Sequence, residues 1–367
     1  MIKRIIIFLV LFLCLGNIVF AIDLSEFSSE IKKYSNEYFP ELKDENLVEN
    51  VTNIEDTFSV SNLLHKLLHS VTGELKNNIS LIFKIIGIAI LCAVLKSIQS
   101  NFGETGISEI AFYVCYLLVV ILIVTSFTNI VELCRSTVNH LSQFMEFLIP
   151  IVISFLAVTG KITTVAMLQP VLLAMISIIT VMLTNFIIPV FFISTVINII
   201  SNISEHINVK RISELLKKSA LWCVEISLVI FASVLSLEGS LAANVDGVTA
   251  KTAKSVVSNA IPVVGKLLGD TVDSVMGGLS ITKNAVGTIG VMVIIAMTIV
   301  PLVRTLILMF TFNLAAAIIE PIADGRIVKC MSAIGDSVKI LFAILATTTF
   351  LFVIAITLMI RMTNFSV

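Results

Sequence analysis

Residues 340–360 read ILFAILATTTFLFVIAITLMI, a stretch without a single charged side chain. An α-helix needs about 20 apolar residues to cross a hydrocarbon core roughly 30 Å thick, and this stretch has that length. Similar aliphatic runs recur from residue 79 onward. The sequence therefore predicts an all-α, polytopic transmembrane protein with about 7 to 9 spans.

Nine apolar runs are candidates for these spans. They are Ile79–Ile98, Ile107–Ile130, Phe144–Thr159, Ile162–Leu183, Phe186–Ile200, Ala220–Leu237, Val286–Val303, Thr305–Ile319 and Ile340–Ile360. The stretch 286–319 has Pro301 and Arg304 at its centre and would measure roughly 50 Å as one straight helix. A broken helix, a re-entrant hairpin and two tight spans all remain open for it.

The bulk composition agrees with a membrane protein. The chain is 57% hydrophobic and 13% charged, whereas soluble domains are about 45–50% apolar and about 25% charged. Lys and Arg total 24 against 25 Asp and Glu, which leaves no basic face for nucleic acid. The six cysteines form no C-x-x-C pair, so we expect small apolar residues and no metal or cofactor site.

The N-terminus has the pattern of a secretory leader. Lys3 and Arg4 precede the apolar stretch 5–20, and Ala21 ends a small-residue cleavage pattern. We predict a signal peptide over 1–21, with an uncleaved anchor helix as the alternative. In both cases the chain from Asp23 onward is exported.

The remaining chain divides by polarity into five further segments. Residues 22–78 are polar with apolar residues at intervals of three and four, which predicts an extracytoplasmic amphipathic helical segment. The others are a first transmembrane region (79–237), a glycine-rich polar or surface-helical segment predicted to be extracytoplasmic (238–285), a second transmembrane region (286–360) and a tail (361–367).

Basic residues in short connections predict the orientation. The connection 203–219 holds Lys210, Arg211, Lys217 and Lys218, so the positive-inside rule puts it in the cytoplasm. Five predicted runs separate it from the exported N-terminal segment, and the two signals agree. If 286–319 crosses twice, the basic connection near Arg326 lies outside; if it crosses once, that connection is cytoplasmic and the C-terminus is exported.

Six charged residues lie in or beside the predicted spans, namely Lys84, Lys96, Glu146, Glu225, Arg304 and Glu320. All but Glu225 and Arg304 lie near span ends, where a side chain can reach the interface. Glu225 and Arg304 are candidates for a buried pair or a water-lined path, because charges in the hydrocarbon core are costly. The alternative for each is a structural polar anchor between packed helices.

Nothing in the sequence indicates catalysis. There is no G-x-S-x-G, no H-E-x-x-H and no phosphate-binding loop, so we expect no catalytic residue and no enzyme. Six glycines between Gly265 and Gly290 allow tight bends and close helix approach. The segment from Asp246 to Gly290 is predicted to form short helices that lie at the membrane surface or dip into it.

A set of residues in the second half of the chain also carries a family likeness. They are Gly265, Gly269, Asp270, Thr271, Asp273, Gly278, Lys283, Asn284, Gly287, Pro301 and Pro321. With these blocks in order, and with an earlier block from Thr159 to Pro189, the chain resembles the stage III sporulation protein AE family over essentially its whole length.

The resemblance implies a multipass protein of the mother-cell membrane that surrounds the forespore. It implies partnership with membrane lipid and with an ATPase, ring-forming proteins and small membrane subunits. Together these would form a secretion-like channel or feeding complex needed for late forespore development. The rival hypothesis is a stand-alone secondary transporter for a small solute, and a third is a scaffold without a pore of its own.

Overall fold

The computed structural model describes residues 60–102, 106–158, 162–203, 209–234 and 264–361. The predicted signal peptide, most of the segment 22–78, residues 238–263 and the tail after Arg361 lie outside the described residues. The described part is a bundle of long helices, and it contains no strand. In chain order they are α4 (Val60–Phe102), α5 (Gly106–Val158), α6 (Ile162–Val181), a π-helical turn η3 (Met182–Ile187), α7 (Ile188–Ile203), a helix over residues 210–234, α9 (Val264–Ile319) and α10 (Gly325–Arg361).

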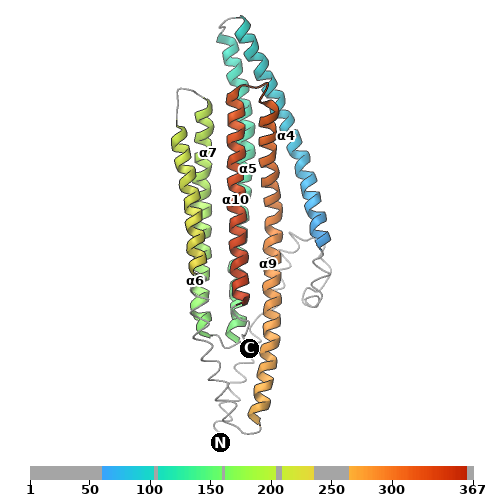
Figure 1. Ribbon diagram of the computed structural model, residues 1–367, viewed down its shortest axis with the longest axis vertical. Helices are drawn as coiled ribbons and strands as arrows, with labels where there is room; N and C mark the ends of the chain where they lie inside the picture. The colour runs from blue at the N-terminus through green and yellow to red at the C-terminus, as the bar shows by residue number, and fades with distance from the viewer. Residues whose placement is uncertain (1–59, 103–105, 159–161, 204–208, 235–263, 362–367) are drawn as a thin grey trace.

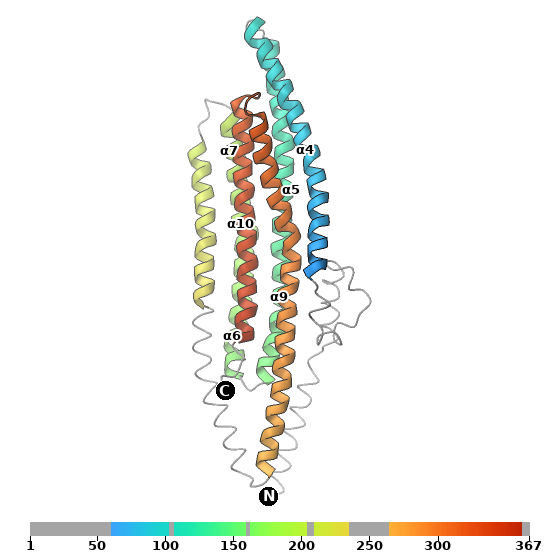
Figure 2. The ribbon, with the colours of Figure 1, turned by 45° about the vertical axis from the view of Figure 1, so that its right-hand side comes forward.

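Successive helices run antiparallel along the long axis of the bundle (Figure 1). The contacts between them agree. Ser194 of α7 pairs with Ser213 of helix 210–234, and Ser227 further along that helix contacts Met182. In both views α4 lies on one side of the bundle and helix 210–234 on the other, while α9 and α10 lie between them (Figure 2).

The helices are fewer and longer than the predicted runs. The runs 107–130 and 144–159 lie within the single helix α5, and the runs 286–303 and 305–319 lie within α9. Five described helices are long and apolar enough to cross a membrane, by length and composition. The number of 7 to 9 spans is therefore not confirmed.

Helix α9 also answers the question left open for residues 286–319. It is one continuous helix with Pro301 inside it, and it already begins at Val264. The expectation of separate short helices over the glycine-rich block is therefore wrong for residues 264–290. Two of its glycines, Gly287 and Gly290, lie where neighbouring helices approach closely, so packing compensates for their low helix propensity.

The helix 162–203 is continuous because of the π-helical turn. Pro189 has no N–H to donate to the carbonyl of Asn185, and its ring would clash with that carbonyl in a regular helix. The wider turn over Met182–Ile187 lies directly before Pro189 and accommodates both effects. The two predicted runs 162–183 and 186–200 are thus one element.

The core lies where α5, α7, α9 and α10 meet. Each contributes fully buried aromatic side chains, which are Phe127 and Phe144, Phe191, Phe312, and Phe352 respectively. The rings of Phe127 and Phe192 stack with centroids 5.9 Å apart. Hydroxyls along the helices donate to carbonyls four residues back, for example Thr305 to Pro301 at 2.7 Å. This internal pairing suits side chains that cannot reach water.

Candidate functional site

Lys283 is the most unusual buried side chain of the bundle. It lies on α9 and is fully enclosed, and its Nζ donates a 2.9 Å hydrogen bond to the carbonyl oxygen of Ile360. Ile360 belongs to the last turn of α10, where carbonyls lack partners within the helix and the helix dipole is negative. The ammonium group therefore fastens the end of α10 to the middle of α9.

Gly287 lies one turn from Lys283 and brings the same two helices together. A Cβ atom at Gly287 would collide with Cδ1 and Cγ1 of Ile360, so the Ile360 side chain would have to move. At Gly290 a Cβ atom would lie 2.5 Å from Cδ2 of Leu148 on α5. Asn284 is half-buried, and its Oδ1 has no hydrogen-bond partner among the described residues. Lys283, Asn284, Gly287 and Gly290 form one joint between α9, α10 and α5.

The other residues of the family pattern do not join this cluster. Gly278 is exposed, and a Cβ atom there would meet nothing within 4 Å, while Pro301 is buried inside α9 and Pro321 is exposed in the turn before α10. Gly265, Gly269, Asp270, Thr271 and Asp273 lie in the first turns of α9. The motif is thus distributed along one hairpin and does not surround one ligand.

The turn between α9 and α10 is held by Asp324. Its Oδ1 accepts the backbone N–H of Arg326 at 2.8 Å and the Arg326 Nε at 3.3 Å. An aspartate before the first helical turn satisfies an N–H group that has no partner within the helix. Asp324 is buried, and it therefore fixes the start of α10 as Lys283 fixes its end.

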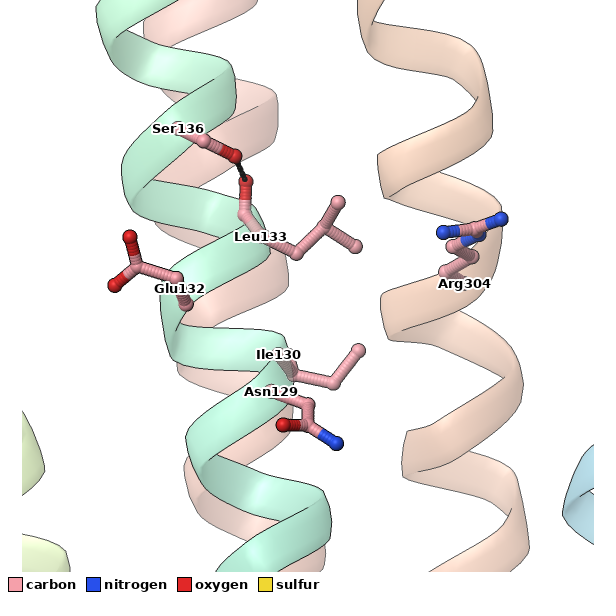
Figure 3. A pocket seen from close by; sticks show the side chains of 6 residues that line it. All are labelled: Asn129, Ile130, Glu132, Leu133, Ser136 and Arg304. Atoms are coloured by element: carbon pink, nitrogen blue, oxygen red, sulfur yellow. Dashed lines mark hydrogen bonds between the residues drawn. The ribbon is translucent and has the colours of Figure 1, made fainter.

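Arg304 lines a groove of about 400 Å³ between α9 and α5. The other lining residues are Asn129, Ile130, Glu132, Leu133 and Ser136. Arg304 lies on the side of α9 next to α5, while Glu132 points away from it (Figure 3). Ser136 donates to the carbonyl of Leu133 at 3.0 Å. The groove thus combines a guanidinium, an amide and a serine hydroxyl with two apolar side chains, while the Glu132 carboxylate points out of it.

The structure does not pair the two candidate intramembrane charges. Glu225 and Arg304 are both exposed, and Glu225 makes no ion pair with any residue that the structure describes. Glu225 lies on helix 210–234, two residues from Ser227, which faces Met182. Arg304 faces α5 instead. A buried Glu225–Arg304 pair is therefore not present in this bundle.

The apolar runs did not predict that Glu132, Leu133 and Ser136 lie on a helix beside Arg304. Residues 131–143 separate two such runs and suggest a connection, although Glu132, Arg135, His140 and Glu146 follow a spacing of three to six on an exposed helix surface. Helical spacing of the polar residues was the available signal. It predicts a polar stripe along a continuing helix.

Near the start of α10, acidic and basic side chains of two helices lie close together. Lys217 of helix 210–234 lies 6.0 Å from the centre of the Phe191 ring. Burial lowers the pKa of Lys217, and the nearby carboxylates of Asp336 and Glu214 oppose that shift. Helix 210–234 and the first half of α10 thus share one charged surface.

These observations define a class: an all-helical bundle with several membrane-length helices, whose buried polar groups fasten helix ends. The comparisons with known proteins give the family. The family model for stage III sporulation protein AE matches residues 42–363. The chain belongs to this family.

One curated relative is also similar over most of its length. The stage III sporulation protein AE of Bacillus subtilis (strain 168) is 30% identical over 341 residues, which cover 93% of this chain and 85% of the relative. No solved structure matches the chain.

Proposed function

We propose that the protein is a non-enzymatic, integral-membrane subunit of a sporulation-specific, secretion-like channel or feeding complex between mother cell and forespore. Membership of the stage III sporulation protein AE family over residues 42–363 is the observation that carries this proposal. The structure supports a structural role, since Lys283 and Asp324 hold the two ends of α10. A rigid helical unit of this kind is suited to assembly with other membrane subunits.

The proposed partners are an ATPase, ring-forming proteins and small membrane subunits of the same complex. The proposed location is the mother-cell membrane around the forespore, and the proposed role is support of late forespore development. Under the orientation predicted above, the basic connection at Lys217 and Lys218 faces the cytoplasm, where an ATPase would act.

Co-purification from sporulating cells tests the proposal. A tagged copy is solubilised in mild detergent after chemical cross-linking, and an untagged strain serves as the control. Ring-forming and motor subunits should be recovered with the tagged copy only. Normal assembly of those subunits and normal forespore development in a strain without this protein would refute the proposal.

The groove at Arg304 keeps the rival function, a secondary transporter, open to test. If the groove binds a solute, Arg304→Gln should abolish its movement across the membrane while the complex still assembles. Glu225→Gln removes an exposed charge outside the groove and is the matched control. In the proposed subunit, both variants leave solute movement unchanged.

A further inference from the structure

The exposed side chains at one end of the bundle differ sharply between its two sides. We call this the turn end, because it holds the turn between α9 and α10 (Figures 1 and 2). Cys115 of α5 lies beside Cys92 of α4, and Tyr113 of α5 lies beside Arg326 of α10, so these three helices are level there. Around this level the exposed large side chains that the structure describes on α4 and α5 are apolar or aromatic, namely Ile90, Leu91, Val94, Tyr113, Val114, Leu117, Leu118 and Ile121. Ser97 is exposed as well, and the charged Lys84 is exposed about two turns before Ile90.

The opposite side of the turn end carries most of the exposed charges, alongside the exposed apolar residues Ile212 and Leu215. Helix 210–234 begins there, because Ser213 pairs with Ser194 near the end of α7. Its first half and the first half of α10 expose Lys210, Arg211, Glu214, Lys218, Lys329, Asp336 and Lys339. A bilayer around the whole turn end would bury all these charges in hydrocarbon, at about 2.5 kcal/mol or more each.

Toward the far end of the bundle, the side formed by α10, helix 210–234 and α6 is the more apolar one. Residues 340–360 of α10 carry no charge, and Phe350 is exposed there. Helix 210–234 exposes Trp222, Val229 and Ile230 around one exposed charge, Glu225, and α6 exposes Met167, Ile178 and Val181. Gly290 of α9 lies against both Leu148 of α5 and Ile356 of α10, so this part of α5 is level with the uncharged part of α10.

The same level of α5 is polar. From the groove toward the far end α5 exposes Glu132, Arg135, His140, Gln143 and Glu146, and α4 exposes Lys76. A bilayer around the whole far half would again bury charges. Polar and apolar surfaces are therefore arranged diagonally across the molecule.

We infer that the lipid belt crosses the bundle obliquely, from α4 and α5 at the turn end to α6, helix 210–234 and α10 toward the far end. The inference rests on membrane residence, which is part of the proposed function, and it adds the surface that contacts lipid. An oblique crossing places the two charged surfaces on opposite sides of the membrane. The basic one, on helix 210–234 and α10, is cytoplasmic by the positive-inside rule.

Helix length supports the oblique belt. The candidate span of α9, Ile281–Ile319, is 39 residues long, roughly 58 Å at 1.5 Å per residue. That is nearly twice the hydrocarbon thickness of about 30 Å. Tilting lengthens the path of a helix through lipid, by up to about 10 Å at a tilt of about 40°, and so takes up part of this length.

Tryptophan fluorescence tests the inference, since the chain has one tryptophan, Trp222. In a Trp222→Phe parent, single tryptophans replace one residue on each of four surfaces: Leu91→Trp and Lys329→Trp at the turn end, and Phe350→Trp and Gln143→Trp further along. All four original side chains are exposed. Each variant must elute and unfold like the parent before it is used.

The variants are reconstituted into phosphatidylcholine–phosphatidylglycerol vesicles with acyl chains brominated in their middle. Leu91→Trp and Phe350→Trp should lose most of their emission to the brominated lipid and little to aqueous acrylamide. Lys329→Trp and Gln143→Trp should show the reverse.

Equal behaviour of Leu91→Trp and Lys329→Trp would overturn the inference, because the belt would then be perpendicular to the bundle axis. Protection of Leu91→Trp from both quenchers would also overturn it, since another protein would cover that surface. If brominated lipid quenches neither native Trp222 nor any variant, membrane residence itself fails. Recovery of partner subunits by co-purification is a separate result and is unaffected by the direction of the belt.

Discussion

A lysine without solvent exposure inside an apolar bundle must be stabilised by its interactions. Lys283 donates to a carbonyl in the last turn of α10, where the helix dipole favours a cation. A shorter or uncharged side chain would remove this hydrogen bond from a part-buried carbonyl. Loss of one partner from a buried hydrogen bond costs about 1–3 kcal/mol.

We therefore expect Lys283→Met to lower the free energy of unfolding by about 1–3 kcal/mol. The measurement is thermal unfolding in detergent, with hydrogen exchange of the last turn of α10 as a local readout. Lys76→Met is the matched control, because Lys76 is exposed on α4. Equal stability of the two variants would show that the Lys283 ammonium does not hold α10.

Gly287 and Gly278 give a second comparison at the residue scale. Both lie in α9, but only Gly287 faces another helix closely. Alanine at Gly278 should be neutral or stabilising by about 0.5–1 kcal/mol through helix propensity. Alanine at Gly287 meets the Ile360 side chain and should destabilise by about 1–3 kcal/mol.

Thermal unfolding of the two glycine variants measures this difference, and the Ile360→Ala background identifies its cause. Removal of the Ile360 side chain beyond Cβ should reduce the cost of Gly287→Ala. A cost that is unchanged in that background would contradict direct contact between these two positions.

At the scale of elements, the central finding is that α5 continues through its polar middle. Ser136 lies inside this helix, and the groove at Arg304 depends on it. We expect Ser136→Pro to destabilise the protein by about 3 kcal/mol or more, because proline breaks a helix interior. Ser136→Ala is the control and should fold normally. A Ser136→Pro variant that folds as well as Ser136→Ala, by detergent chromatography and thermal unfolding, would indicate a loop at this position.

Apolar runs predicted that helices exist, but not where they end. Hydropathy falls at Glu132 and at Arg304 although the backbone stays helical, because one exposed charged side chain does not interrupt a helix. Asn185 and Pro189 look like a break, yet a π-helical turn absorbs them. The sequence also singled out Lys283 and Gly287, but the pairing of both with Ile360 depends on tertiary packing that no local pattern encodes.

At the scale of the whole molecule, continuous helices reduce the number of predicted membrane crossings before helix 210–234. The number stays odd, so that helix still begins on the side opposite to the exported N-terminal segment. Three helical segments, α4, α5 and 162–203, now precede the basic start of helix 210–234, in place of five predicted runs. Because α9 is one helix, the turn at Asp324 lies at the same end of the bundle as that basic segment (Figure 1). Both basic regions are then expected on the cytoplasmic side.

Cysteine labelling in intact, non-sporulating cells that express the protein in their cell membrane checks this expectation. Lys218→Cys and Lys329→Cys, both at exposed positions, should resist a membrane-impermeant maleimide until the cells are opened. The parent strain without added cysteines gives the background of the native thiols. Labelling of one position from outside and of the other only after lysis would place them on opposite sides and contradict a single crossing by α9.

The position of α10 within the bundle bears on biogenesis. It is the last of the described helices to leave the ribosome, yet it packs against α5, α7 and α9. Until α10 has been synthesised, lipid or an insertion factor must cover the surfaces of α5, α7 and α9 that α10 will contact. The measurement is the protease sensitivity of α9 in chains stalled before Gly325 and in released full-length chains. Depletion of membrane insertases should change this sensitivity to different extents in the two kinds of chain.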